Sequence, residues 1–125
     1  MTKRVWFEKG IICQQVDKSG LTVDTLKEDL VKLLEFQAEL KKQNAPLYIL
    51  YDAANALSAD SATRQQAIYV MSCLNYQKVA VFGIRSVFMK YIAKFVIAGI
   101  RKREKIKIFD SKEQAEHWLR LGNKN

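Results

Sequence analysis

The sequence predicts an α/β domain built on a mostly parallel sheet that opens with an antiparallel hairpin. Two observations lead to this expectation: two short β-rich runs flank Glu8-Lys9-Gly10 near the start, and apolar runs of strand length later alternate with segments of helical period. The chain has 125 residues, of which 49% are hydrophobic and 27% are charged. We therefore expect one domain over residues 1–125, with about four helices packed on the sheet.

The first half of the chain predicts the hairpin and then a long helix. Residues 4–7 and 11–16, on either side of the predicted turn, are short runs rich in β-branched or aromatic residues. Leucines then recur at helical spacing, and Thr25 with Glu28 has the spacing of a capping box. We expect this helix to end near Asn44, because a proline follows shortly afterwards and cannot continue it.

The second half predicts alternating strands and helices. Apolar runs of strand length occupy residues 47–51, 79–82 and 106–109. One helix is expected after residue 60, and another from about Arg85 to Arg103. Ser111 with Gln114 predicts the cap of a final helix, which Gly122 is expected to close. Strands and helices in this order indicate parallel strands joined by crossover helices.

Sequence motifs in the second half resemble those of a known family. An Asp closes the strand YILYD, a VAVFG strand follows, and residues 108–119 read IFDSKEQAEHWL. Together with the order of elements, these motifs resemble the SpoIIAA-like family, which is related to STAS and SEC14 domains. The resemblance runs from about residue 46 to residue 119, and Phe109, Ala115, Trp118 and Leu119 match the closing motif of that family. It implies a SpoIIAA-like fold.

The same resemblance draws attention to Ser61. In the anti-sigma-factor antagonists of the family, an Asp-Ser-Ser-Gly segment opens a helix, and its serine is phosphorylated to switch partners. Here the corresponding residues 59–63 read Ala-Asp-Ser-Ala-Thr, so Asp60 and Ser61 match and the second Ser and the Gly are absent. The resemblance implies that Ser61 is a candidate regulatory phosphosite, and the alternative is a serine that only caps the helix.

The positive charge of the chain is concentrated near its C-terminus. Residues 1–77 contain 9 Lys and Arg against 9 Asp and Glu, whereas residues 78–125 contain 12 against 4. Such an asymmetry is typical of proteins that meet an acidic partner, such as a lipid headgroup, a nucleic acid or an acidic protein surface, and it also serves solubility. The candidate residues for an anionic ligand or membrane are Lys90, Lys94, Arg101, Lys102 and Arg103.

The predicted helix from Arg85 to Arg103 is unusually apolar. Projected at about 100° per residue, its apolar face is centred on Phe88, Ile92, Phe95 and Gly99. The opposite stripe contains Lys90, Lys94 and Arg101, with Ile97 among them. Two interpretations are open: burial against neighbouring helices or in a homodimer contact, and a helix that lies at an anionic membrane surface or covers a lipid pocket.

No catalytic or metal-binding pattern accompanies these features. Asp52 ends a predicted strand, where α/β sheets place ligand contacts, so Asp52 and Asp60 are candidate loop-site residues, although a loop-capping carboxylate is favoured. His117 is the only histidine, and Cys13 and Cys73 are far apart in the sequence. Glycine-rich phosphate motifs are absent. We therefore expect no enzyme activity, no metal and no cofactor.

The expected location and function follow from these patterns. Charged residues interrupt the apolar N-terminal run, so no signal peptide is expected, and the apolar run 87–100 is shorter than the roughly 20 residues of a membrane span. We expect a non-enzymatic cytoplasmic binding module that regulates a protein partner or forms a homodimer. The alternative is a lipid-binding or small-molecule-binding domain of SEC14-like type at an anionic membrane surface. Nucleic-acid binding is disfavoured, because no groove-reading or stacking motif is present.

Overall fold

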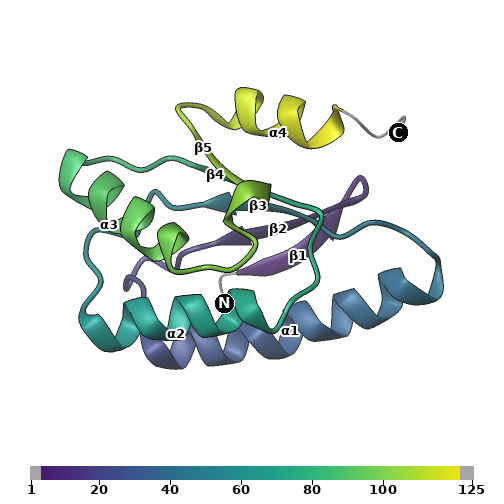
Figure 1. The fold of residues 1–125 in the computed structure, drawn as a ribbon, viewed down its shortest axis with the longest axis horizontal. Helices are drawn as coiled ribbons and strands as arrows, with labels where there is room; N and C mark the ends of the chain where they lie inside the picture. Colours follow the sequence, from purple (N-terminus) through teal and green to yellow (C-terminus); the bar gives the residue numbers. More distant parts are fainter. Residues whose placement is uncertain (1–3, 122–125) are drawn as a thin grey trace.

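The computed structural model describes residues 4–121, which form one five-stranded sheet and four α-helices (Figure 1). The strands are β1 (Val5–Glu8), β2 (Ile11–Gln15), β3 (Tyr48–Asp52), β4 (Lys78–Phe82) and β5 (Ile106–Phe109). The α-helices are α1 (Val23–Lys42), α2 (Ser61–Ser72), α3 (Val87–Ala98) and α4 (Lys112–Arg120), and a 3-10 turn, η1 (Arg103–Lys105), precedes β5.

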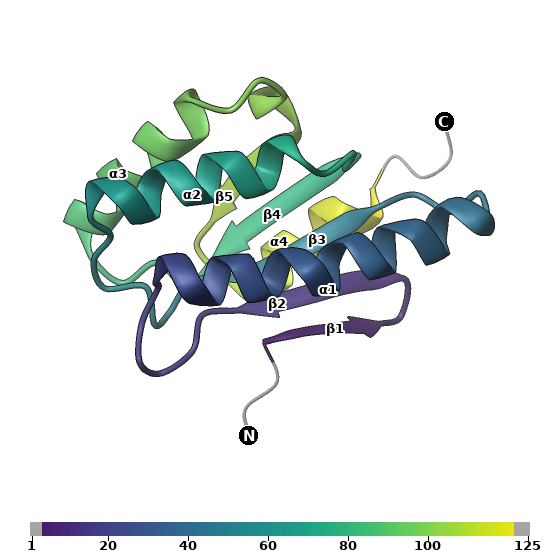
Figure 2. The same ribbon diagram turned by 90° about the horizontal axis from the view of Figure 1, so that it is seen from below.

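The strands lie in the sheet in the order in which they occur in the sequence. β1 pairs with β2 in the antiparallel sense, and β2 to β5 are all parallel to one another. Right-handed crossovers between successive parallel strands place their helices on the same face. Accordingly, α1, α2 and α3 follow one another over one face, and α4 covers the opposite face (Figures 1 and 2). The predicted α/β class, with its mixed sheet and four helices, is confirmed.

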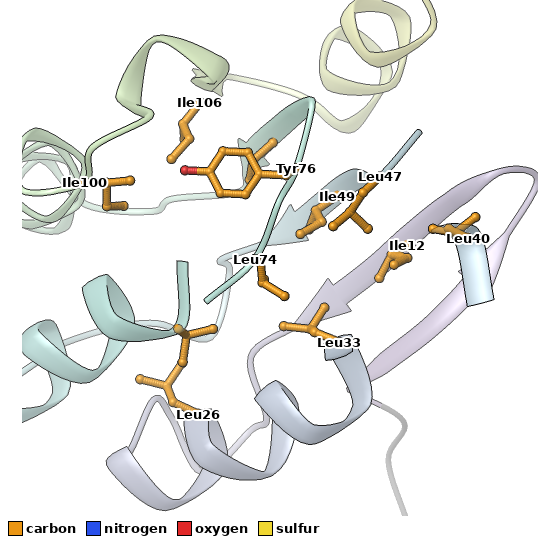
Figure 3. Packing of buried hydrophobic residues seen from close by; sticks show 12 residues of the cluster. Ile12, Leu26, Leu33, Leu40, Leu47, Ile49, Leu74, Tyr76, Ile100 and Ile106 are labelled. Atoms are coloured by element: carbon orange, nitrogen blue, oxygen red, sulfur yellow. The ribbon is translucent and has the colours of Figure 1, made fainter. Parts of the chain in front are cut away.

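The larger core lies between the sheet and the helices α1 and α2. Alternate residues of the strands point toward these helices, so that Ile12 and Ile49 pack with Leu33 of α1, and all three are almost completely buried (Figure 3). Tyr76 is 1% exposed, and its hydroxyl points toward Ile100 and Ile106 without a hydrogen-bond partner among the described residues.

A second core joins the sheet to α4. The intervening residues of the strands face this helix, where Leu50 and Ala80 pack against Ala115 and Leu119. Trp118 lies beside Phe109 with ring centroids 5.5 Å apart, so the apolar residues of the closing motif hold α4 on the sheet.

The caps of α1 differ from the prediction. The capping box is formed by Thr22 and Thr25, whose hydroxyls accept hydrogen bonds from each other's backbone N–H groups at 3.1 and 3.2 Å. The predicted pair of Thr25 with Glu28 was wrong, since Glu28 forms an ion pair with Arg4 instead. At the other end the helix stops at Lys42, and Asn44 adopts a left-handed conformation with φ of 55°.

The apolar helix α3 is shorter than predicted. It begins after Ser86, whose Oγ accepts a hydrogen bond from the Met89 N–H at 3.0 Å, and it ends at Ala98, with Gly99 as the C-cap residue. A Cβ atom at Gly99 would lie 2.9 Å from Ile68 Cδ1, so this glycine allows a close approach between α2 and α3. The predicted cap of the last helix is confirmed, because Ser111 Oγ accepts a hydrogen bond from the Gln114 N–H at 3.2 Å. Gly122 lies outside the described residues.

Candidate binding surface and cavity around helix α3

An apolar cavity of about 140 Å³ lies between α3, α2 and the sheet. It is open to one side, and most of its wall consists of aliphatic side chains from the two helices and the strands. Helix α3 contributes its inner face, which consists of Met89, Ile92, Ala93, Val96 and Ile97. This helix therefore lies beside α2 and packs against it (Figure 2). The cavity lies between these two helices and the sheet.

The outer face of α3 is apolar as well. Four large side chains on this face are exposed, and we call them the outer stripe: Val87 (72%), Phe88 (66%), Tyr91 (70%) and Phe95 (68%). They fall within about 100° of the helix circumference. Phe88 and Phe95, which the helical projection placed at the centre of the apolar face, thus point away from the core, and Ile97, predicted among the lysines, lines the cavity.

The cations around α3 differ in their availability. Lys94 is exposed on α3, and Arg101 and Arg103 are exposed after it; none of the three forms an ion pair or hydrogen bond with another described residue. The prediction that Arg101 lies on the helix with Lys90 and Lys94 was wrong, because the helix ends at Ala98.

The other two predicted cations already have partners. Lys90 Nζ lies 3.7 Å from Asp110 Oδ1. Lys102 Nζ donates a hydrogen bond to Asn75 Oδ1 at 2.8 Å and lies 5.4 Å from the centre of the Tyr76 ring. Lys102 therefore helps to fix the turn after α3, while Lys94, Arg101 and Arg103 remain open to solvent.

Asp52 stabilises the loop after β3. Its Oδ1 accepts a hydrogen bond from the Ala54 N–H at 3.0 Å, as the loop-capping interpretation expects. Gly83 lies next to it with φ of 86°, and a Cβ atom there would be 3.1 Å from Asp52 Oδ1. The two residues therefore join the ends of β3 and β4 tightly, and the carboxylate of Asp52 is engaged within the fold.

Asp60 and Ser61 lie at the start of α2, and their roles differ. Asp60 is the capping residue, because its Oδ1 accepts a hydrogen bond from the Thr63 N–H at 2.8 Å, which lowers the pKa of this carboxyl. Ser61 is the first residue of the helix and is exposed. Its hydroxyl is therefore not required for the cap.

The remaining chemically reactive side chains do not come together. His117 is exposed on α4, whereas Cys13 and Cys73 are half-buried free thiols in other parts of the fold. Among residues 4–121, no three His, Cys, Asp or Glu side chains are grouped in a way that could hold a metal ion. None of the helices in this range has the length and hydrophobicity needed to cross a membrane.

Sequence reasoning missed the polar residues of the cavity wall. Gln14 and Tyr51 are partners in the β2–β3 register, and Arg64 lies in the first half of α2; all three line the cavity. Burial, together with the charges of Asp29 and Asp52, raises the pKa of the Tyr51 hydroxyl. Of the three, only Tyr51 belongs to a motif noted in the sequence, YILYD. No local sequence pattern indicates that the three residues line one cavity.

A partly buried ion pair between Arg4 and Asp29 lies next to Gln14. Asp29 of α1 is 5% exposed, and its Oδ1 accepts a hydrogen bond from Arg4 Nε at 2.9 Å. Gln14 Nε2 donates to the other carboxylate oxygen at 3.4 Å. Burial raises the pKa of Asp29, although its hydrogen bond with Arg4 opposes this shift. This cluster fixes α1 against the hairpin.

Comparison with known proteins places the chain in a family. A family model described as domain of unknown function DUF7793 matches residues 5–121, which is nearly the whole chain, and the chain belongs to this family. No curated protein and no solved structure matches the chain.

Proposed function

We propose that this member of the DUF7793 family is a non-enzymatic binding module that docks on an anionic membrane surface through the outer face of α3. The observation that carries the proposal is the outer stripe, in which four large apolar side chains are 66–72% exposed on one helix. Apolar patches of this kind mark interaction sites more often than scattered apolar residues do.

The charges around the stripe favour an anionic surface. Between Gly83 and Arg103 the sequence contains six Lys and Arg residues and no Asp or Glu. An amphipathic helix with aromatic side chains on one face and cations at its borders is typical of helices that lie in a membrane interface. Each cation near an acidic lipid surface contributes about 1 kcal/mol of attraction, which decreases with salt.

The same charges argue against a homodimer through this face. A two-fold contact brings each residue of the patch toward the equivalent patch of the second copy. The exposed cations Lys94, Arg101 and Arg103 would then approach their own counterparts with few carboxylates to compensate. An anionic surface removes this repulsion and uses the same cations for attraction.

Co-sedimentation with phosphatidylglycerol vesicles tests the proposal. We expect binding at low salt, loss of binding at high salt, and little binding to phosphatidylcholine. Replacing Lys94 and Arg101 by Gln should weaken binding about 30-fold, which corresponds to about 2 kcal/mol. The matched control replaces Lys32 and Lys41, two exposed lysines of α1, by Gln and should leave binding almost unchanged.

A second pair of variants tests the apolar contribution. Phe88→Ser with Phe95→Ser should weaken vesicle binding, whereas Val31→Ser with Leu34→Ser, on the exposed face of α1, should not. If the wild type does not bind phosphatidylglycerol at low salt, or if both double variants behave alike, the outer stripe does not dock on membranes.

A second candidate function is regulation of a protein partner through Ser61. The observation that favours it is that the Ser61 side chain is exposed and is not needed to cap the helix. Ser61 is exposed at the start of α2 while Asp60 provides the cap. A phosphate at this place would lie near the N-terminal N–H groups of the helix, where negative charge is stabilised. The order of elements and the closing motif also support a SpoIIAA-like fold as part of this proposal.

Pull-downs from the native host test the second candidate. The proteins recovered with Ser61→Asp should differ from those recovered with the wild type, and Ser58→Asp, at an exposed position in the preceding loop, serves as the control. Recovery of the same proteins by all three forms would reject the phosphorylation switch.

A further inference from the structure

We infer that the cavity beneath α3 is a binding site for a small apolar carboxylate, such as a short fatty acid or an aromatic acid. This site lies on the inner side of α3, whereas the proposed membrane contact uses the outer side, so the inference goes beyond the proposed function and does not depend on it.

The size and lining of the cavity define the apolar part of the ligand. Its volume of about 140 Å³ is close to that of engineered apolar cavities, about 150 Å³, that bind benzene. The wall around this space is formed mainly by side chains of Ala, Val, Ile, Leu and Met. A single ring or a short alkyl chain would fill it and would replace the dispersion contacts that an empty space lacks.

The polar residues of the wall lie toward one end. Gln14 and Tyr51 are each the second-last residue of a parallel strand, and Arg64 is the fourth residue of the helix that starts at the same edge of the sheet. All three therefore line the part of the cavity near the carboxyl edge of the sheet. This arrangement matches a molecule with an apolar body and one polar end.

Arg64 selects the charge of that end. Among the described residues that line the cavity, it is the only Lys or Arg, and its Nη1 donates a hydrogen bond to the Ala59 carbonyl at 2.6 Å. Within residues 4–121 its guanidinium forms no ion pair with a carboxylate, since Asp60 caps α2 and Asp29 is paired with Arg4. A guanidinium has further N–H groups in a planar fork, which fits a carboxylate with two hydrogen bonds.

Tyr51 supports the same polar end. Its phenolic hydroxyl is a hydrogen-bond donor at neutral pH, and it lines the same cavity as Arg64, so it can donate to a carboxylate oxygen. A carboxylate between Arg64 and Tyr51 would leave the tail of the ligand against the inner face of α3.

Calorimetric titration of the protein, without vesicles, tests this assignment with hexanoate, phenylacetate and hexanol. We expect one or both acids to bind, and the preferred acid identifies the ligand class as alkyl or aromatic. Hexanoate should bind about tenfold more tightly than hexanol, because a hydrogen bond to a charged group stabilises a complex by about 1.5 kcal/mol or more. Arg64→Gln should remove this preference for the acid over the alcohol.

Two alanines of α3 provide a test variant and its matched control. Ala93→Leu places a larger side chain in the cavity and should abolish binding of the acids, whereas Ala98→Leu adds the same volume on the exposed side and should not. Ala67→Leu fills the cavity from α2 and replaces Ala93→Leu if that variant does not unfold cooperatively. Absence of binding to both acids, unchanged binding in the filled variant, or a preference for hexanoate that persists in Arg64→Gln would each overturn the inference.

Discussion

The two faces of α3 should respond very differently to the same substitution. Met89 on the inner face is 5% exposed, whereas Phe95 on the outer stripe is 68% exposed. Replacing a buried Met by Ala removes apolar contacts and leaves a cavity, which costs about 2–5 kcal/mol. The lower half of this range is expected for Met89, because it adjoins space that is already open.

The expected cost at Phe95 is much smaller. Complete burial of a large apolar side chain stabilises a fold by about 1.5–3 kcal/mol, and only about a third of the Phe95 surface is removed from water. Phe95→Ala should therefore lower the free energy of unfolding by about 0.5–1 kcal/mol, although Phe is the larger residue.

Urea unfolding followed by circular dichroism measures both values from the midpoint and the slope of the transition. The measurement should be repeated at two protein concentrations, because a self-associating stripe would make the midpoint depend on concentration. If Phe95→Ala costs as much as Met89→Ala, the outer stripe is packed in solution and its assignment as a free docking surface is wrong.

Two further predictions concern the ion pair of α1 and the cap of α2. Arg4→Met should lower the free energy of unfolding at pH 7 by about 2–3 kcal/mol, because the carboxylate of Asp29 is left buried without its partner. Loss of the guanidinium raises the pKa of Asp29 in the folded variant further above its unfolded value. At low pH Asp29 is protonated and its burial costs little. This stability is lost as the pH rises through the folded pKa and the carboxyl becomes charged. The difference between the variant and the wild type should therefore shrink from pH 7 to pH 4, as measured by urea unfolding, and a constant difference would contradict the burial of Asp29. Asp60→Ala should lower the melting temperature clearly more than Ser61→Ala does; equal shifts would mean that Ser61 also takes part in the cap.

The sequence predicted the fold well where periodicity and turn residues agree. The apolar runs 47–51 and 79–82 were recognised because helices cover both faces of the inner strands, so that these runs consist of aliphatic and aromatic residues. The cap at Ser111 was predicted because its Oγ bond is local. The predicted capping box of Thr25 with Glu28 was wrong because Glu28, although it has the right spacing in the sequence, forms an ion pair with Arg4, which is distant in the sequence.

The orientation of α3 could not be obtained from its sequence. A helix that is apolar around most of its circumference gives no single direction for its buried face, so Phe88 and Phe95 could be assigned to the core. The neighbours of the helix decide the matter: α2 and α3 approach closely at Gly99, Met89 is buried between α3 and the rest of the fold, and the outer stripe is exposed. The polar end of the cavity could not be predicted for a similar reason. Gln14 and Tyr51 are neighbours only because β2 pairs with β3 in this register, and Arg64 reaches the same cavity only because of where the crossover places α2.

The outer stripe is difficult to explain as a requirement of the fold. Its four side chains contribute little buried area, and exposed apolar groups in a row increase the risk of aggregation. Polar residues at these positions would keep the inner contacts of Met89 and Val96, and they would make α3 an ordinary amphipathic helix. Exposed cations beside the stripe oppose association of identical copies, and they favour an acidic surface at the same time. The core contacts of α3 thus need only its inner side, and the apolar and basic character of the outer side is what the proposed membrane docking would use.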